Sequence, residues 1–443
     1  MSHPLDGLIR DAYRADDVRA ITRHLTERGT FEFPTLSSGL FSAALADNQD
    51  LAYTGYQNVW VRDNIHIAHQ FYVLGEHERA VRAVAAITQF QHTQRGKLRD
   101  IIVGKANPQS VMLRPHIRFD GDKLTEVPEQ WAHAQNDAIG YWLWLASKLA
   151  HEGHWQPTGD DIKLLSNFVQ YLEAVRFWKD EDSGHWEEAR KIEASSIGAA
   201  TAGLNALREY FLTMASAQMP SGATKSFIDQ TCRRAEGLIE HGRAALKAIL
   251  PSECVQNDSG QRRRYDSALL FLIYPLQIVD GEMAQTIVTD VVTQLLGPFG
   301  VRRYLGDSYW CADYKKLLDP ANRTVDVSED MSARDRLLQP GGEAQWCIFD
   351  PILSIIHGQR FQQTGDSGQL EMQRQHLNRS LRQLTGDGGP FPPLRCPESY
   401  YRENGCWGPN DITPLLWTQA NLRLALHFME QSLLLGSGKV AVV

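Results

Sequence analysis

The sequence lacks the features that mark disulfide-rich, membrane-bound and nucleic-acid-binding proteins. Its six cysteines are scattered over 443 residues without a CxxC pair or zinc-finger spacing, which is typical of reduced thiols in the cytosol. No run approaches 18 uninterrupted apolar residues, and the first residues have no basic segment followed by an apolar core. The net charge of −8 is spread along the chain without a basic stripe. We therefore expect a cytoplasmic protein that binds neither membranes nor nucleic acid.

Motifs for several common chemistries are also missing. There is no GxSxG sequence for a serine nucleophile and no glycine fingerprint for a dinucleotide. His133, His151 and His154 are not matched by a further ligand cluster, so we expect no metal site. Residues 436–439 resemble the end of a phosphate loop, but no helix follows them. We expect no cofactor, and the sequence leaves the oligomeric state undetermined.

What the chain does contain is helical periodicity, repeated along most of its length. With 43% hydrophobic and 22% charged residues, its composition is that of a globular protein. The clearest β signal is a hairpin formed by residues 113–119 and 123–127 around Asp120-Gly121. Apolar spacing and helix-stop residues predict helices over 16–27, 39–45, 65–74, 77–94, 139–149, 162–175, 195–214, 226–249, 265–279, 284–296, 344–357, 371–384 and 413–435.

Two segments, 305–342 and 386–408, read as long loops, and long loops in compact domains tend to carry function. No linker or low-complexity stretch interrupts the chain. We therefore predict a single domain, residues 1–443, of the all-α class. The helix tally alone leaves a barrel, a solenoid and a bundle open.

The stretch Gly184-His185-Trp186-Glu187-Glu188-Ala189-Arg190 places an indole beside two carboxylates at the start of a helix. Glycoside cleavage needs one carboxylic acid to protonate the bridging oxygen and a second carboxylate to activate water. Taken alone, Glu187 and Glu188 are better explained as first-turn acids favoured by the helix dipole.

Similar groupings of tryptophan with charged residues recur at other loop-to-helix junctions. Indoles pack against the apolar faces of a sugar ring, whereas acids and arginines bind its hydroxyls. The alternative is that each tryptophan fills core and each acid caps a helix. The groupings are Trp60/Arg62/Asp63, Trp131/Gln135/Asp137, Trp186/Glu187/Glu188, Arg302/Arg303/Asp307, Trp346 and Glu398.

These segments, taken in order, resemble the glucoamylases of glycoside hydrolase family 15. The resemblance is closest to the branch that includes the amino-terminal domain of the phosphorylase kinase α and β regulatory subunits. It implies an (α/α)6 barrel, a six-hairpin toroid with a short β-hairpin and long loops at the active-site end. The matching segments are Val59-Trp60-Val61-Arg62-Asp63-Asn64, Gln130-Trp131 to Asp137, His185-Trp186-Glu187-Glu188, Glu193 to Gly198, Arg303 to Tyr309, Glu343 to Trp346, Pro397-Glu398-Ser399-Tyr400 and Pro414 to Trp417.

Carried over residue by residue, the resemblance implies that Glu187 is the general acid and Glu398 the general base. Because inversion needs room for a water molecule, we expect roughly 6.5–9.5 Å between the two carboxyl groups. We also expect Trp186 and Trp131 to desolvate Glu187, and Glu398 to remain ionised and wet on a Gly/Pro-rich loop. The substrate-binding residues are expected to be Trp60, Arg62, Asp63, Trp131, Gln135, Asp137, Trp186, Glu188, Arg303 and Trp346.

The resemblance thus implies an inverting exo-acting hydrolase that releases glucose from the non-reducing end of an α-glucan or α-glucoside. The base motif Pro397-Glu398-Ser399-Tyr400-Tyr401 and segment 305–342 are closer to the kinase-subunit branch than to secreted glucoamylases. A glycan-sensing regulatory barrel in glycogen metabolism is therefore the alternative. A helical scaffold without a ligand would leave the tryptophan and acid groupings unexplained.

Overall fold

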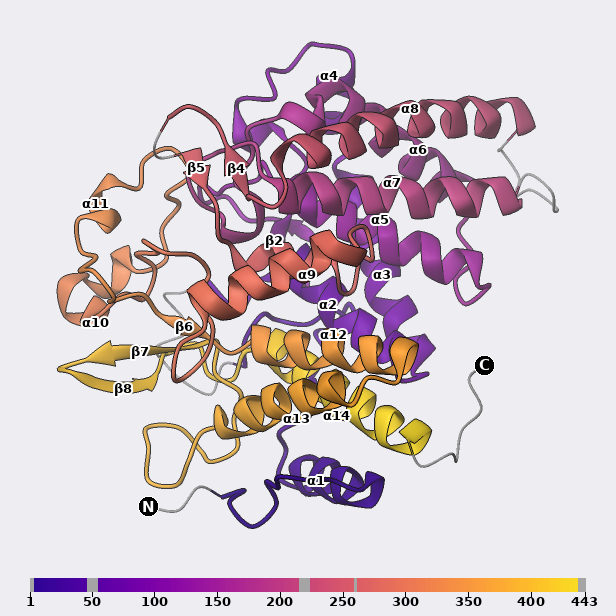
Figure 1. Cartoon of the computed structure of the whole chain (residues 1–443). Coiled ribbons are helices and arrows are strands. Elements are labelled where there is room, and N and C mark those ends of the chain that lie inside the picture. The colour runs from indigo at the N-terminus through magenta and orange to yellow at the C-terminus, as the bar shows by residue number, and fades with distance from the viewer. Residues whose placement is uncertain (1–3, 46–54, 215–223, 259–260, 437–443) are drawn as a thin grey trace.

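The computed structural model describes residues 4–45, 55–214, 224–258 and 261–436. Most of these residues are helical, and short strands and irregular loops gather at one end of the helices (Figure 1). The phosphate-loop-like residues 437–439 lie outside the described part of the chain. None of the helices in the described ranges is long and apolar enough to span a bilayer.

Six consecutive segments of the described chain form an inner ring that closes on itself. Each contacts the next, and the last contacts the first. The inner segments are the most buried of the fold; fourteen of the sixteen residues of α5, for example, are buried. They are α2 (Val61–Val73), α5 (Asn136–His151), α7 (Ala194–Met214), the short 3-10 helix η6 (Ser267–Leu272), α12 (Phe349–Thr364) and α14 (Leu416–Gly436).

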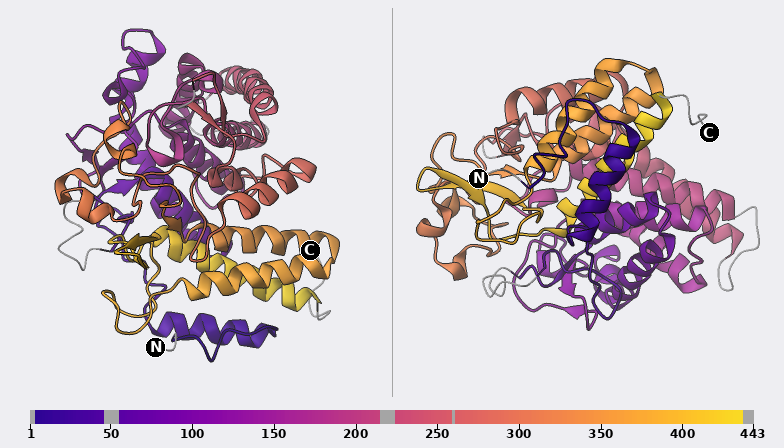
Figure 2. Two further views of the ribbon diagram at one scale, coloured as in Figure 1. Left: turned by 60° about the vertical axis from the view of Figure 1, so that its left-hand side comes forward. Right: turned by 90° about the horizontal axis from the view of Figure 1, so that it is seen from below.

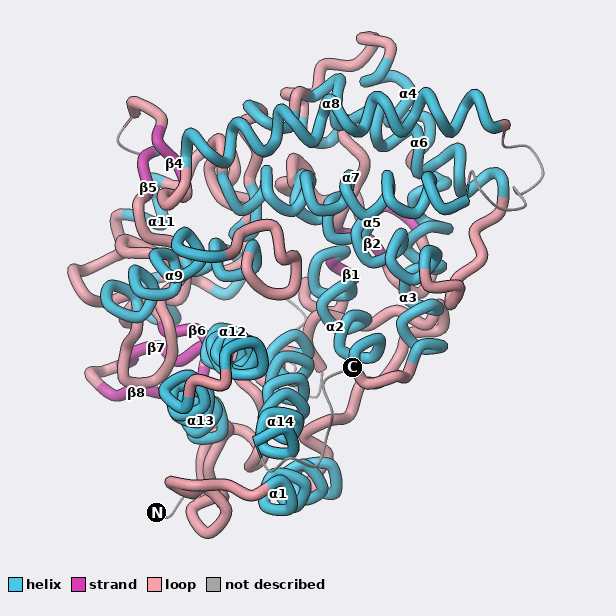
Figure 3. Tube along the Cα trace, turned by 45° about the vertical axis from the view of Figure 1, so that its right-hand side comes forward, coloured by secondary structure: helices cyan, strands magenta, loops and turns pink. Residues whose placement is uncertain are grey.

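An outer ring of amphipathic helices covers these segments. The buried residues of α8 follow the three- and four-residue spacing of one helix face, as Ile228, Thr231, Cys232 and Ala235 show. In Figure 3, α12, α13, α14 and α1 are seen nearly end-on, with α1 outermost. The outer helices are α1 (Ala15–Glu27), α3 (His77–Thr93), α6 (Gly159–Val175), α8 (Lys225–Ile249), α9 (Gly281–Asp290) and α13 (Ser367–Arg382).

The two rings make an (α/α)6 barrel, as expected, and the chain closes it with its two ends, because α1 packs against α14 (Figure 2). Aromatic side chains from five inner segments meet near the barrel axis. The His66 ring of α2 lies 4.7 Å from Tyr141, 5.1 Å from Phe271 and 4.4 Å from Trp417, and Phe271 lies 5.8 Å from Phe349. This aromatic cluster plugs the barrel beneath its loop-bearing end.

The remaining elements are short and belong mostly to that end. The predicted hairpin is present as β2 (Arg118–Asp120) and β3 (Thr125–Glu126), which are antiparallel, and β1 (Val59–Trp60) extends it. The others are β4 (Cys254–Val255) with β5 (Arg262–Arg263), β6 (Gln345–Trp346) with β7 (Ser399–Glu403) and β8 (Cys406–Pro409), and the helices α4 (Arg95–Ile102), α10 (Tyr314–Leu317) and α11 (Ser332–Asp335).

Several sequence-based predictions of local structure are wrong. Segment 386–408, expected to be a loop, holds β7 and most of β8, and residues 113–117, expected in the hairpin, are not in a strand. Residues 39–45 are not helical, because the Asn64 side chain binds both the backbone N–H and the carbonyl of Phe41. Only six residues of 265–279 form a helix, and it is a 3-10 helix. The predicted helix over 344–357 begins instead with strand β6, which pairs with β7.

The two inner helices α5 and α7 approach so closely that only glycine fits between them. A Cβ atom on Gly140 would lie 2.3 Å from the backbone carbon of Ala199, and one on Gly203 would lie 2.5 Å from the Gly140 carbonyl oxygen. On the other side of α7, a Cβ on Gly198 would lie 2.2 Å from the Leu272 side chain of η6. Replacing Gly140 must therefore push two inner helices apart.

We expect Gly140→Ala to lower the free energy of unfolding by about 1–3 kcal/mol or more, the usual cost of overpacking. Gly237→Ala in α8 is the matched control, since no atom lies within 4 Å of its added Cβ. That control should stabilise the protein by up to about 1 kcal/mol through helix propensity. Urea unfolding of the two variants gives the comparison, and equal effects would contradict the close packing.

Candidate active site

A cavity of about 780 Å³, including space open to solvent, lies at the loop-bearing end of the barrel above the aromatic cluster. Its walls come from segments far apart in the sequence, including the start of α2, the loop before α7 and the loop before β7. The predicted site residues on its lining are Trp60, Arg62, Asp63, Trp131, Trp186, Glu187, Arg303, Trp346 and Glu398.

Three other predicted substrate-binding residues do not line the cavity but lie beneath it. Gln135, Asp137 and Glu188 are 2%, 0% and 1% exposed. Gln135 and Asp137 accept hydrogen bonds of 3.0 and 2.9 Å from Arg62, and Glu188 accepts one of 2.8 Å from Arg303. Their structural role is to hold the two arginines that face the cavity.

Glu187 projects from a strained backbone position. It follows the 3-10 turn η4 (Gly184–Trp186) with φ of 58°, a left-handed conformation that costs a non-glycine residue about 1–2 kcal/mol. Its carboxylate accepts a 3.2 Å hydrogen bond from Trp60 Nε1 and a 2.9 Å hydrogen bond from Arg62 Nη2. Such strain is common at functional sites, where surrounding contacts hold it in place.

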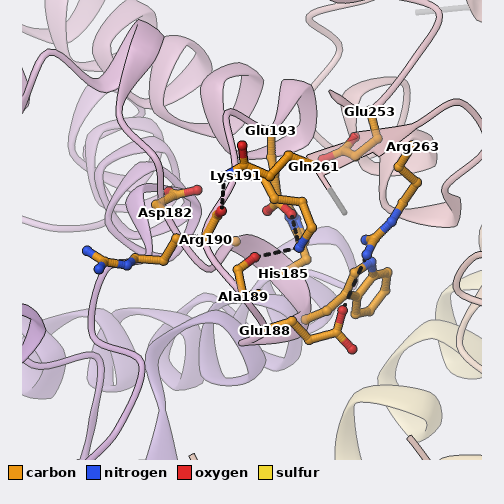
Figure 4. Close-up of polar contacts among 12 residues, drawn as sticks. Asp182, His185, Glu188, Ala189, Arg190, Lys191, Glu193, Glu253, Gln261 and Arg263 are labelled. Atoms are coloured by element: carbon orange, nitrogen blue, oxygen red, sulfur yellow. Dashed lines mark hydrogen bonds and ion pairs between the residues drawn. The ribbon is translucent and has the colours of Figure 1, made fainter. Parts of the chain in front are cut away.

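The loop that carries Glu187 is closed by buried polar contacts (Figure 4). Asp182 and Lys191 pair through both backbone hydrogen bonds at its base. The Lys191 ammonium, on a residue 2% exposed, donates to the Ala189 carbonyl at 2.5 Å and lies 3.8 Å from Glu193. Trp186 anchors the loop from the other side, because its indole N–H donates to Asp266 at 3.0 Å.

Glu188 points away from Glu187, into a cluster of arginines. Its oxygens lie 2.8 Å from Arg303, 2.8 Å from Arg334 and 3.4 Å from Arg263, and Tyr304 donates a 2.6 Å hydrogen bond to it. Burial alone would raise the pKa of Glu188, but the three guanidinium groups lower it to about 2. Glu188 is therefore a permanent anion, unsuited to giving or taking a proton.

The environment of Glu398 differs from the one expected from the sequence. It is 1% exposed rather than wet, and it immediately precedes β7. Tyr56 donates a 2.7 Å hydrogen bond to one carboxylate oxygen, and Asn410 donates a 2.6 Å bond to the other. Burial raises the pKa of Glu398 to about 7, although both hydrogen bonds oppose the shift. The Gly/Pro-rich composition of the neighbouring loop gave no sign of this burial.

The cavity walls are largely aromatic. Trp60 and Trp131 meet edge to face with ring centroids 5.9 Å apart, and Trp346 lies 5.9 Å from Trp186. Among the described residues, the buried indole N–H groups of Trp131, Trp346 and Trp417 have no hydrogen-bond partner. Unpaired donors around a cavity suit a ligand rich in hydroxyl oxygens.

Several residues of the cavity were not predicted. Tyr56, Tyr309, Arg334 and residues 323–327 line it, and Asn410 holds Glu398 from behind. Trp417 also lines it and lies in one of the matching motifs, so the resemblance could have found it. Tyr309 likewise ends a matching motif, and residues 323–327 and Arg334 lie in the long loop 305–342. Tyr56 and Asn410 had no such signal, because their roles depend on contacts between distant segments; the Tyr56 to Glu398 bond spans 342 residues.

Comparison with known proteins agrees with this arrangement. Residues 27–391 match the family described as glycosyl hydrolases family 15. The chain belongs to this family. The match ends shortly before Glu398, so the family assignment rests on the rest of the barrel and on the acid loop.

Among curated relatives, the skeletal-muscle regulatory subunit alpha of phosphorylase b kinase from Oryctolagus cuniculus is 27% identical over 279 residues. That match covers 57% of this chain and 21% of the relative, so the chain spans only about a fifth of it. An Escherichia coli protein described as uncharacterized lipoprotein YgeQ is 27% identical over 217 residues, covering 41% of this chain and 76% of that protein.

Solved structures share the fold at lower identity. A structure titled "Glycosidase Wild Type" has 18% identity and a TM-score of 0.63, with 94% of this chain and 97% of that chain covered. The glucoamylase from Saccharomycopsis fibuligera has 11% identity and a TM-score of 0.60, with 98% of both chains covered. At these identities the likeness shows the fold alone, which is the (α/α)6 barrel predicted from the sequence.

Arg62 provides a test of how the site is held together. We expect Arg62→Met to lower the free energy of unfolding by about 3–5 kcal/mol, because Asp137 would be left buried without its cation. The double variant Arg62→Met/Asp137→Asn removes that uncompensated charge and should recover part of the loss. Urea unfolding of the two single variants and the double variant measures the coupling. Additive effects would contradict a direct Arg62–Asp137 dependence.

Proposed function

We propose that this chain is an inverting, exo-acting glycoside hydrolase that releases glucose from the non-reducing end of α-glucans or α-glucosides. The observation that carries the proposal is that Glu187 and Glu398, from loops about two hundred positions apart, line one cavity together with Trp60, Arg62 and Asp63. A protein that only binds a glycan has no need of two carboxyl groups of opposite roles in one pocket.

In the proposed reaction, Glu187 protonates the glycosidic oxygen as the bond to the anomeric carbon breaks. Glu398 removes a proton from a water molecule that attacks that carbon from the opposite face of the ring. The product from an α-glucoside is then β-glucose. The water-sized separation of the two carboxyl groups that this mechanism requires stays a prediction.

The surrounding residues have supporting roles in this proposal. Trp60 and Arg62 fix the direction of the Glu187 carboxylate, and Tyr56 and Asn410 fix that of Glu398. Burial raises the pKa of Asp63 to about 7, so a substantial fraction of this carboxyl group is protonated at neutral pH and can donate to a sugar oxygen. The indoles supply the apolar surfaces for the sugar ring.

The second candidate function is a regulatory barrel that binds an α-glucoside without cleaving it. It is favoured by the 27% identity to a phosphorylase b kinase regulatory subunit, a relative whose name describes a regulatory part. Under this alternative the cavity would still take a glycan, and the chain would act in glycogen metabolism. Turnover separates the two functions.

The decisive experiment incubates wild type, Glu187→Gln and Glu398→Gln with maltose, longer maltooligosaccharides, isomaltose and trehalose. We expect wild type to release β-glucose, and each variant to lose about 10²–10⁴-fold in kcat, the usual contribution of general acid or base catalysis. The anomer is followed by NMR or polarimetry.

Glu240→Gln is the matched control, since this exposed residue of α8 lies outside the cavity lining. Its kcat should equal that of wild type. Saturable binding of maltose by wild type without release of glucose from any of the substrates would support the regulatory alternative.

The raised pKa of Glu398 predicts the pH dependence. A general base must be ionised, so kcat/KM should fall as pH drops through about 7, where Glu398 becomes protonated. The hydrogen bond from Tyr56 lowers this pKa, so Tyr56→Phe should move the acidic limb to higher pH. A pH–rate profile of both proteins tests this. A wild-type limb near pH 4–5, or a limb that Tyr56→Phe leaves in place, would exclude Glu398 as the titrating base.

A further inference from the structure

One segment of the cavity wall differs from the rest in its position and exposure. Most lining residues are buried, including Trp60 and Glu398, whereas residues 323–327 are half-buried or exposed. Val325 is 47% exposed although it lines the cavity. We call residues 323–334 the strap; it begins after α10 and runs into α11, on the side of the molecule where β7 and β8 project (Figure 1).

The first end of the strap is fixed on the Glu398 side of the cavity. The Arg323 guanidinium donates to the carbonyls of Leu318 and Lys315 at 3.1 and 3.0 Å, and Tyr314 donates a 2.8 Å bond to the Arg323 carbonyl. Arg323 also lies 4.0 Å from Asp411, to which Lys315 donates at 2.8 Å. Asp411 follows Asn410, the residue that holds Glu398.

The other end is fixed to the loop that carries Glu187. Arg334 donates a 2.8 Å hydrogen bond to Glu188, the neighbour of Glu187. The Met331 sulfur accepts a 3.2 Å hydrogen bond from the Ala189 backbone N–H, and the Glu329 carboxylate lies 3.3 Å from the Arg190 guanidinium. The strap therefore runs from the base side of the cavity to the acid side.

Between these anchors, Thr324, Val325, Asp326 and Val327 line the cavity. This part of the strap thus borders the cavity between the loop of Glu187 and the loop of Glu398. The anchors at both ends include buried charged groups, with Glu188 and Arg334 1% and 10% exposed at their side chains. Moving the strap aside would separate these charges, which is costly.

The charge pairing on the cavity lining indicates which ligands it can bind. The four arginines on its lining are each close to protein carboxylates: Arg62 to Asp137 and Glu187, Arg303 to Asp307 and Glu188, Arg334 to Glu188, and Arg323 to Asp411. A phosphorylated or otherwise anionic sugar would have to displace those partners. The lining thus suits an uncharged sugar.

We propose that the strap sets substrate length, so that the cavity takes a short neutral α-glucoside of two or three sugar units and excludes longer α-glucan chains. The proposal rests on the hydrolase function above and names its substrate class. The strap acts as a wall on the leaving-group side, and Val325 and Asp326 are the residues that a longer chain would meet.

The test measures glucose release from maltose and from maltoheptaose by wild type and by a variant lacking Val325 and Asp326. In wild type, we expect kcat/KM for maltose to exceed that for maltoheptaose by at least about tenfold, the scale of discrimination that a steric wall gives. The deletion should reduce the ratio to near one. Val325→Trp, which adds bulk at the same place, should raise it, and serves if the deletion variant does not fold.

Val103→Trp is the matched control, because Val103 is 66% exposed and lies outside the cavity lining; its ratio should equal that of wild type. A wild-type ratio near one, or an equal ratio in wild type, the deletion variant and Val325→Trp, would overturn the strap proposal and leave the hydrolase intact. If no substrate releases glucose, the hydrolase proposal fails. Calorimetric Kd values for maltose and maltoheptaose then test the strap, and the same tenfold preference is expected.

Discussion

The structure of the site depends on the buried guanidinium of Arg62. It stands near the start of α2 and donates to Asp137 near the start of α5, to Gln135, to the carbonyl of Gly184 and to Glu187. One side chain thus joins two inner helices to the loop that carries the proposed acid. A buried ion pair adds little net stability by itself, but its geometry is fixed, because losing either partner leaves an uncompensated charge in the interior.

Neighbouring charges also determine the protonation of the two buried glutamates near the cavity. Glu188 is surrounded by three arginines, which makes it a fixed anion. Glu398 has hydrogen bonds but, within the described part of the chain, no ion pair, and burial raises its pKa to about 7. The surroundings of these two glutamates therefore shift their pKa values in opposite directions. Only the second is suited to exchanging a proton near neutral pH.

The barrel accounts for where this chemistry is placed. The inner ring is filled along its axis by His66, Tyr141, Phe271, Phe349 and Trp417, so no ligand can pass through it. The site is therefore confined to the end where the loops lie, with the aromatic cluster as its floor and the strap across its rim. Loops of this kind can vary in length without disturbing the rings, and so they can set which substrates a shared fold accepts.

The sequence by itself determined the helical class, most helix positions, the hairpin turn and, through its motifs, the family and nine of the residues on the cavity lining. Helix periodicity and short motifs are local properties, which is why they can be found in a single chain. Tertiary structure alone decided that Glu188 is buried among arginines away from the cavity, and that Glu398 is buried. It also decided that Gln135 and Asp137 support Arg62 from below, and that residues 323–334 cross from one loop to the other. Each of these depends on a contact between segments distant in the sequence, and burial and charge pairing arise only when those segments meet.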